Sequence, residues 1–441
     1  MAAARASAGR PRKRRPPAQA PARPGRADPA RRLPAVSDPG ELGYRDILRI
    51  PEIRAAVVGT LVIMMGFGIV SPILPLYARS FGVSLDAVGV LIAAFSVTRL
   101  AMDPFAGVII DRLGERAAAV VGAAVVGATT ALAAVAPTFP LLVVFRGAGG
   151  AGSAVFFAGL LSFLLRAVPG DRVGRVMSVW YASFNVGIIA GEPFGGVLAH
   201  WLGPASTLWV YAGACFVAAV VFSRTIPAVR RDEPPKDRPR GLRHLRFDRP
   251  FVTVLLANGA YAWMIAGVYS TLIPLFGHEI VRLSPVGIGI GLAIASATEF
   301  AALFPAGAAT DRIGRKAVIV PSYALLAASL VLWPLASTPV RYMVGLGIFG
   351  LITGYSGVPQ AAMLSDLTTE DSQRSAVAAF RFVGDLGFVL GPLVAGFSAD
   401  RLGYGPAFAI SAVPIVVALA LLLSIPETLR ALPKTGEAAG L

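Results

Sequence analysis

The stretch GVIIDRLGER at residues 107–116 places charged side chains directly after an apolar run, and GAATDRIGRK at residues 307–316 nearly repeats it. The same offset of two hundred positions relates several glycines, Gly187 with Gly387, Gly191 with Gly391 and Gly196 with Gly396. Duplication of one unit explains such an offset most economically. The sequence therefore predicts two similar halves, each with one copy of the charged segment.

The composition predicts that both halves lie in a membrane. Of the 441 residues, 55% are hydrophobic and 15% are charged, whereas soluble domains average about 25% charged residues. A bilayer core about 30 Å thick needs about 20 helical residues to cross it. We expect an all-α integral membrane protein with two homologous six-helix halves and spans at 54–78, 86–108, 116–136, 139–165, 175–200, 204–225, 250–276, 284–308, 317–337, 340–365, 374–399 and 404–426.

The segments outside the spans differ in composition. Residues 1–50 are rich in Ala, Pro and Arg and poor in large apolar residues, which predicts a disordered basic tail. Residues 227–249 are charged and Pro-rich, as in a flexible linker. We therefore expect a first half over 51–226, this linker, a second half over 250–427 and a second tail over 428–441.

Arg and Lys are distributed unevenly between the expected loops. The loops on one side of the membrane contain Arg112, Arg116, Arg166, Arg172, Arg175, Arg312, Arg315 and Lys316, and those on the other side contain Arg79, Arg282, Arg341 and Arg401. Cytoplasmic loops carry the excess of positive charge. We therefore expect a cell membrane protein with both termini in the cytoplasm. The basic tail favours attraction to anionic lipid over binding of nucleic acid.

Both charged segments lie between the second and third expected span of their half and follow a glycine. In this respect DRLGER and DRIGRK resemble the signature loop of the major facilitator superfamily, and the resemblance extends over about residues 54–426. It implies a secondary transporter that works by alternating access. It also implies a latch, in which an acid of the loop meets the start of a helix in the other half. The predicted gating residues are Gly107, Asp111, Arg112, Gly114, Arg116, Gly307, Asp311, Arg312, Gly314, Arg315 and Lys316.

Topology alone does not account for these loops. Positive charge that holds a loop in the cytoplasm explains the Arg residues but not Asp111 and Asp311, which are acids at an edge that favours bases. An acid there needs a partner, and a helix N-terminus attracts an anion. Gly107 allows a close approach of helices, and Gly114 permits the turn. Glu115 stands where a basic residue is commoner, which predicts a weaker latch in the first half.

Several ionisable residues lie inside the expected spans, where each costs about 2.5–3.5 kcal/mol unless it is paired or faces water. Arg99 and Asp103 share a helix face, and so do Arg381 and Asp385. The resemblance places the second and eleventh spans side by side, which predicts Asp103–Arg381 and Arg99–Asp385 pairs and, by the same offset, a Glu299–Asn185 pair. We favour gating or coupling over purely structural pairing, because such residues usually mark a pathway.

The fourth span contains RGAGGAGSA, in which Gly147, Gly149 and Gly152 form a literal GxGxxG. A nucleotide-binding loop is excluded, because the motif lies within a membrane-length apolar run with no βαβ unit. Arg146 with the glycines resembles the fourth-span motif of the superfamily, whose Arg is implicated in proton coupling. The alternatives are that Arg146 contacts the substrate or extends toward the outer interface.

The fifth span contains NVGIIAGEPFGG, in which Gly187, Gly191 and Gly195 make a smooth face for helix packing. Gly387 and Gly391 repeat this face in the second half. The stretch resembles the motif of the superfamily's antiporters, with Glu192 in the place of the usual proline. Glu192 is a candidate to carry a proton or meet a cationic drug, and the alternative is a harmless place at the outer mouth.

These features together predict a proton-coupled exporter of small amphipathic compounds that functions as a monomer among membrane lipids. The alternatives are a proton-coupled importer of a metabolite and a membrane receptor or scaffold that has lost transport. We expect no enzyme activity, cofactor or metal, because no nucleophile has a credible base, Cys215 is alone, and the histidines are scattered.

Overall fold

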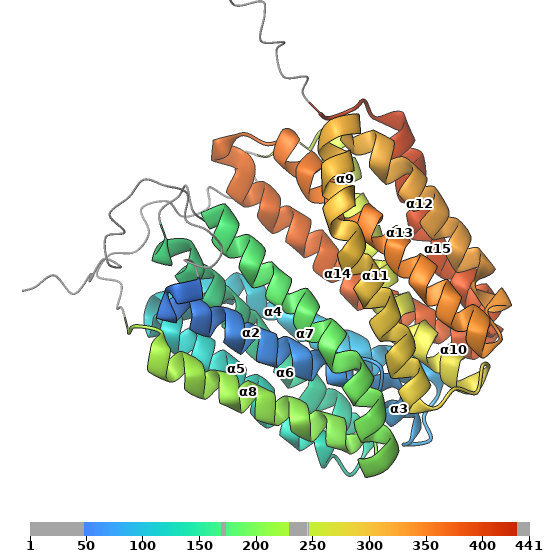
Figure 1. The fold of residues 1–441 in the computed structure, drawn as a ribbon, viewed down its shortest axis with the longest axis horizontal. Coiled ribbons are helices and arrows are strands. Elements are labelled where there is room, and N and C mark those ends of the chain that lie inside the picture. Colours follow the sequence, from blue (N-terminus) through green and yellow to red (C-terminus); the bar gives the residue numbers. More distant parts are fainter. Residues whose placement is uncertain (1–47, 169–172, 229–244, 246, 430–441) are drawn as a thin grey trace, which may run out of the picture. The chain divides into compact units, whose positions relative to one another are not determined.

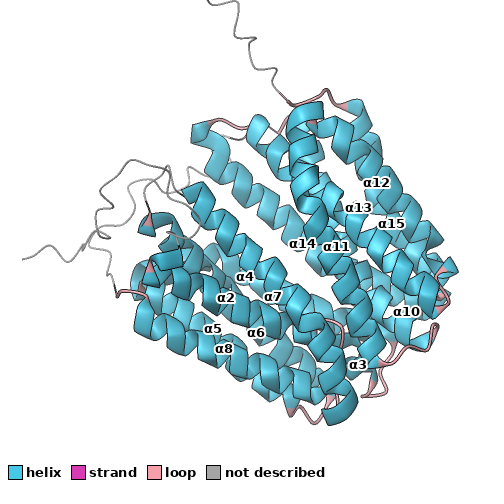
Figure 2. Ribbon diagram, in the orientation of Figure 1, coloured by secondary structure: helices cyan, strands magenta, loops and turns pink. Residues whose placement is uncertain are grey.

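The computed structural model describes residues 48–168, 173–228, 245 and 247–429. The expected tail over 1–50, the linker over 227–249 and the tail over 428–441 lie almost entirely outside these residues. Figure 2 shows helices joined by short loops, and every regular element of the described part is helical. This confirms the predicted all-α class.

The first half contains six spans, of which the first is interrupted. Its elements are α2 (Pro51–Val70), α3 (Leu74–Arg79), α4 (Leu85–Leu113), α5 (Glu115–Ala134), α6 (Phe139–Ala167), α7 (Val173–Leu202) and α8 (Ala205–Thr225). The prediction of one continuous helix over 54–78 was therefore wrong in this detail, because the helix breaks between Val70 and Leu74. Pro72 and Pro75 have no N–H to donate to the preceding turn, which accounts for the break between α2 and α3.

The second half repeats this order with an uninterrupted first span. Its elements are α9 (Arg249–Met264), η3 (Ile265–Leu272), α10 (Ile273–Glu279), α11 (Pro285–Ile313), α12 (Arg315–Leu332), η4 (Trp333–Leu335), α13 (Pro339–Asp366), α14 (Glu370–Leu402) and α15 (Tyr404–Ser424). The η3 segment is a π-helix that continues α9 into α10, with Thr271 Oγ1 donating to the Ala266 carbonyl at 2.8 Å. No feature of the sequence predicted this π-helix.

All twelve expected spans are helical, although they differ in how apolar they are. Within the described residues, eleven helical stretches are long and apolar enough to cross a membrane, and α7 is not among them. Asn185 and Glu192, together with several glycines, lower the hydropathy of α7. It still lies among the other helices of its half, packed against α2.

Each half packs mainly within itself, and four long helices make most of the contacts between the two halves. Figure 1 shows α2–α8 gathered in one group and α9–α15 in another. Between the groups, α4 packs against α14 and α7 packs against α11. These four helices therefore form most of the surface at which the halves meet.

The interface is tight at one end of these four helices. At the end that contains Arg79 and Glu279, here called the sealed end, a Cβ added to Gly89 or Gly289 would overlap the backbone of the other half. The Leu85 N–H also donates to Asp400 Oδ1 at 3.0 Å. At the end with the turns at Gly114 and Gly314, here called the motif end, a Cβ added to Gly107 or Gly307 would meet nothing within 4 Å. The halves are thus pressed together at the sealed end and looser at the motif end.

Candidate functional site

The motif loop of the first half turns at a glycine and buries an acid. Gly114 ends α4 with a φ of 83°, a conformation that favours glycine, and α5 begins at Glu115. Glu115 is only 4% exposed. It accepts a hydrogen bond from Ser162 Oγ at 2.6 Å and forms an ion pair with Arg166. The unusual acid at this position is therefore matched by a base at the end of α6.

The motif loop of the second half has the same geometry with the charges exchanged. Gly314 has a φ of 110°, and Arg315 takes the place of Glu115. Arg315 Nε donates to Asp366 Oδ2 at 3.0 Å, and its side chain is 11% exposed. Asp366 is two hundred positions from Arg166. The ion pair is thus retained in both halves with its acid and base swapped.

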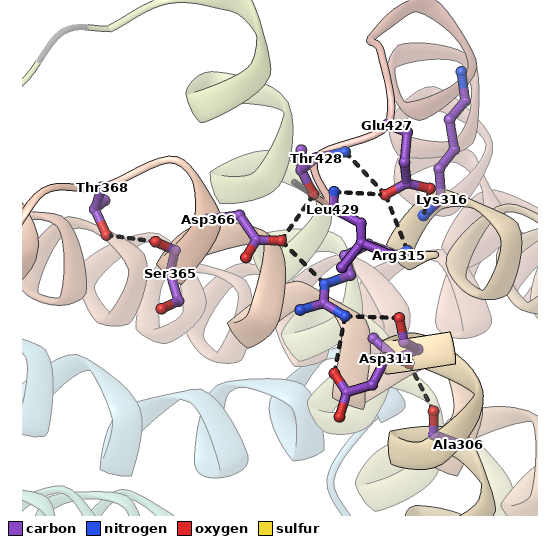
Figure 3. A network of polar contacts seen from close by, with 11 residues as sticks. Ala306, Asp311, Arg315, Lys316, Ser365, Asp366, Thr368, Glu427, Thr428 and Leu429 are labelled. Atoms are coloured by element: carbon purple, nitrogen blue, oxygen red, sulfur yellow. Dashed lines mark hydrogen bonds and ion pairs between the residues drawn. The ribbon is translucent and has the colours of Figure 1, made fainter. Parts of the chain in front are cut away.

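The segment that follows α15 binds to the same loop, as Figure 3 shows. Glu427 accepts hydrogen bonds from the backbone N–H of Arg315 at 3.0 Å and of Lys316 at 2.9 Å. Lys316 Nζ in turn donates to the Leu423 and Ile425 carbonyls. An acid at the start of α12 is favoured by the N–H groups that a helix leaves unpaired there. The chain beyond the last span is therefore fastened to the motif loop.

Glu427→Gln is expected to lower the stability of the second half by about 1 kcal/mol, as for loss of a helix cap. Partial burial raises the pKa of Glu427, but the backbone donors of Leu429, Lys316, Arg315 and Thr428 outweigh it and hold the pKa below the ordinary value. A lowered pKa stabilises the fold above the ordinary pKa, and this contribution is lost as pH falls through the lowered one. Thermal unfolding of purified protein should separate wild type from variant at neutral pH and not in strong acid. Equal midpoints at neutral pH would contradict the capping role.

The acids of the motif loops lie at the surface. Asp111 and Asp311 are both exposed, as are Arg112 and Arg312. Asp311 Oδ1 accepts from Arg315 Nη1 at 2.9 Å, within its own loop (Figure 3). Arg116 is partly buried at the start of α5. For Asp311, the contact in this structure is therefore local to its own half, and the predicted latch remains a prediction.

One of the expected pairs between α4 and α14 is present. Arg99 Nη2 lies 3.6 Å from Asp385 Oδ1, and Asp385 is 6% exposed. The described residues contain no ion pair between Asp103 and Arg381, although both act electrostatically on Asp385. The Arg381 guanidinium instead lies over the ring of Phe157, 4.9 Å from its centroid. The expected Asp103–Arg381 pair is therefore not formed here.

Two acids, one on α7 and one on α11, accept hydrogen bonds from side chains of the seventh span. Glu192, which α7 contributes, is 0% exposed, and its Oε1 accepts hydrogen bonds from Tyr269 at 2.8 Å and Ser296 at 3.2 Å. Glu299 is half-buried, and its Oε1 accepts from Tyr261 at 3.1 Å. Both acids thus receive hydroxyl donors from the seventh span.

The expected Glu299–Asn185 pair is not observed among the described residues. Tyr261, from the same half, supplies the donor to Glu299, and Asn185 Nδ2 donates to the Tyr181 carbonyl of its own helix at 3.1 Å. Each group is therefore satisfied without the other. Glu192 is buried between the halves, so the alternative of a harmless place at an outer mouth is wrong.

Arg146 is buried within the first half. It is 6% exposed, and its guanidinium lies 4.3 Å from the ring centroid of Phe95. Tyr211 and Cys215 of α8 lie beside it, and its Nε has no hydrogen-bond partner among the described residues. The alternative that Arg146 extends to an interface is therefore wrong. The Arg146 guanidinium is therefore a charged group buried among the helices of the first half.

The glycines chosen for helix packing lie where helices cross closely. A Cβ on Gly191 would overlap the backbone of α2, and one on Gly391 would overlap the backbone of α9. The remaining members of the two faces make the same contacts, Gly187 and Gly195 against α2 and Gly387 against α9. The equivalent helices of the two halves therefore pack through equivalent glycines.

The sequence analysis missed the partners of most charged residues described above, and it missed one ion pair at the sealed end. Arg79 Nε lies 2.8 Å from Glu279 Oε1 across the sealed end, and Tyr404 donates to Glu279 Oε2 at 2.9 Å. Arg79 and Glu279 are themselves two hundred positions apart, as are the swapped residues of the motif loops. Comparing charges at this offset could have found both sets. Tyr261, Tyr269 and Ser296 carry no such signal.

Comparisons with known proteins agree with this architecture. A family model described as Major Facilitator Superfamily matches residues 56–298 and 281–440. A chloramphenicol resistance protein of Streptomyces lividans is 27% identical over 364 residues, which cover 80% of this chain and 90% of that protein. The quinolone resistance protein NorA of Staphylococcus aureus is 26% identical over 249 residues, which cover 55% of this chain and 62% of NorA.

The likeness extends to solved structures. A bacterial homologue of the human lysosomal transporter Spinster, solved in an inward-facing and occupied conformation, gives a TM-score of 0.73 at 15% identity, with 87% of this chain and 97% of that chain covered. At this identity the likeness shows a shared fold.

Proposed function

Because this chain belongs to the major facilitator superfamily, we propose that it exports small amphipathic compounds across the cell membrane in exchange for protons. The family is the one that the two charged segments predicted. Membership makes the chain a multi-pass membrane transporter. Export, proton coupling and the class of compound are the parts that we propose.

The distribution of positive charge supports an orientation with the motif end in the cytoplasm. The motif loops carry Arg112, Arg116, Arg312, Arg315 and Lys316, and the positive-inside rule assigns such loops to the cytoplasm. In this proposed orientation the sealed end faces outward and the looser motif end faces the cytoplasm, which fits a state that is accessible from the cytoplasm. An exporter takes up its substrate in that state.

The observation that carries proton coupling is the placement of Glu192 and Glu299. Both are acids inside membrane-spanning helices, and their hydrogen-bond partners are hydroxyl groups. Intramembrane acids of this kind commonly form proton relays in pumps and transporters. Glu192 also joins the two halves, so a change in its protonation acts on the surface across which they move. The relatives that confer chloramphenicol and quinolone resistance support export and suggest the first compounds to test.

Drug accumulation in intact cells distinguishes export from its alternatives. Cells that produce the protein should accumulate less radiolabelled chloramphenicol or quinolone than matched cells that produce Arg146→Ala with Glu192→Ala, and a protonophore should abolish the difference. Higher accumulation than in the control would indicate an importer. If a panel of apolar and amphipathic compounds gives equal accumulation, transport is not the function.

Asp111→Asn is expected to slow transport several-fold while leaving membrane insertion and substrate affinity nearly unchanged. The acid lies at an edge that otherwise carries bases, and we propose that it binds a helix start in the other half when the motif end closes. Initial rates in vesicles, measured at several substrate concentrations, separate turnover from affinity. Unchanged turnover in Asp111→Asn would rule out the latch.

A further inference from the structure

Glu192 is a carboxyl group at the contact between the halves that has hydroxyl donors but no cationic partner among the described residues. The first half contributes Glu192 itself, and the second half contributes both of its donors, Tyr269 and Ser296. We infer that Glu192 is the proton-binding site that controls the sealed end, and that its proton leaves toward the motif end through Glu299. This inference rests on the proton coupling proposed above and assigns it to particular atoms.

The surroundings of Glu192 favour its neutral form. Its Oε2 meets no donor, and no ion pair involves Glu192 in the described part of the chain. The titratable groups that face it are Tyr269 from η3 and Glu299 from α11, while α2 contributes the apolar Met65 and Ile69 nearby. An isolated buried carboxylate is costly, and a second acid increases that cost. The sealed end is therefore most stable while Glu192 holds a proton.

The hydroxyl groups around Glu192 can serve both of its protonation states. Tyr269 lies 2.8 Å from Glu192 Oε1, 2.8 Å from Ser296 Oγ and 3.1 Å from the Leu292 carbonyl. When Glu192 is neutral, it can donate to Tyr269, which then donates to Leu292. When Glu192 is ionised, Tyr269 and Ser296 both donate to it. Loss of the proton therefore leaves Glu192 hydrogen-bonded, with Tyr269 turning its donor from the Leu292 carbonyl to the acid. It also leaves a buried charge, which opening of the sealed end would hydrate.

Glu299 provides the exit toward the motif end. Ser296 and Glu299 are three residues apart on α11 and so share a face, with Glu299 nearer the motif end. Transfer breaks the O–H bond of Glu192 and forms one on the Glu299 carboxylate. Tyr269 and Ser296 each accept one proton and release one, so they end unchanged. Glu299 is half-buried, whereas Glu192 is fully buried. A proton can therefore leave in the state in which the sealed end is closed.

The π-helix η3 aligns the two tyrosines with the two acids. An α-helix turns about 100° per residue, so Tyr261 and Tyr269, eight residues apart, would diverge by about 80°. The wider π turns rotate less per residue and bring Tyr269 back toward the side of Tyr261. Tyr261 then binds Glu299 while Tyr269 binds Glu192. The irregular segment thus serves the proposed path, as π turns at functional sites often do.

A distance measurement across the sealed end tests the inference without any transported compound. Leu202 and Leu402 end α7 and α14 and are 70% and 57% exposed, so cysteines at both positions can carry spin labels in a Cys215→Ala chain. Raising the pH from about 5 to about 9 should increase the ratio of open to sealed molecules at least about tenfold in this otherwise native chain. In Glu192→Gln, which mimics the neutral acid, the sealed population should persist at every pH.

Two further variants keep the test decisive if Glu192→Gln folds poorly. Tyr269→Phe removes a donor to the ionised acid but keeps the ring beside Phe349, so it should alter the pH at which the sealed end opens. Tyr342→Phe, the control, removes a buried hydroxyl that donates to the Ile273 carbonyl and should leave that pH unchanged. A pH response that survives in Glu192→Gln, or that is equal in Tyr269→Phe and Tyr342→Phe, overturns the inference. Proton-independent transport would instead overturn the proposed function, whatever the distances show.

Discussion

Replacing Arg315 by Glu is expected to remove most of the folded protein, and adding Asp366→Arg to the same chain is expected to restore much of it. The single change places a carboxylate beside Asp366 and Asp311 in a largely buried position. Removing one partner of a buried pair typically costs about 3–5 kcal/mol. The double change recreates in the second half the Glu115–Arg166 arrangement of the first. The fraction of monodisperse protein after extraction and the thermal midpoint measure both effects.

The first half supplies the reciprocal experiment. Glu115→Arg alone should lower the stability of the protein, and adding Arg166→Asp should restore part of that stability. The second half shows that the exchanged pair fits this geometry. If each double variant is no more stable than its worse single variant, the two pairs are not equivalent and the swapped-charge account is wrong.

Asp103→Asn is expected to shift the protein toward the state in which the motif end is open. In this structure Arg381 lies over Phe157 while Asp385 pairs with Arg99. We propose that closing the motif end brings Arg381 to Asp103, so the neutral variant loses that pair in the closed state alone. A difference of several kcal/mol between two states largely determines their populations. Cysteine accessibility at the motif end should therefore rise in Asp103→Asn.

Exchange of the charges provides the control for this shift. Asp103→Arg with Arg381→Asp should recover part of the transport that each single change removes, and accessibility should fall back. Unchanged accessibility in Asp103→Asn together with no recovery in the exchange would show that these residues do not form a gate. Asp103 would then act with Asp385, its close neighbour, and not with Arg381.

The sequence predicted the fold well because membrane thickness fixes the length of an apolar helix and the offset of two hundred fixes the two halves. It did not predict the break between α2 and α3 or the π-helix η3. Nothing in the sequence of η3 distinguishes a π-helix from an α-helix. The break has a local cause in Pro72 and Pro75, which a closer reading could have used.

The charged residues could be found in the sequence, but most of their partners could not. Glu192 is conspicuous as an acid in an apolar run, whereas Tyr269 is an ordinary aromatic residue until the π turns direct it toward that acid. The Arg99–Asp385 pair was predictable because both residues lie at matched depth on helices that the family places together. The Asp103–Arg381 pair was predicted by the same reasoning, but in this structure Arg381 lies over Phe157 instead.

Transport into vesicles with an imposed pH gradient tests the central claim most directly. In inside-out vesicles that contain the protein, an acidic lumen should drive accumulation of a transported compound, because protons leaving the lumen are exchanged for substrate entering it. Collapsing the gradient should abolish accumulation, and Glu192→Gln should show none. Accumulation that is equally fast without a gradient, or that requires an acidic exterior, would contradict proton-coupled export.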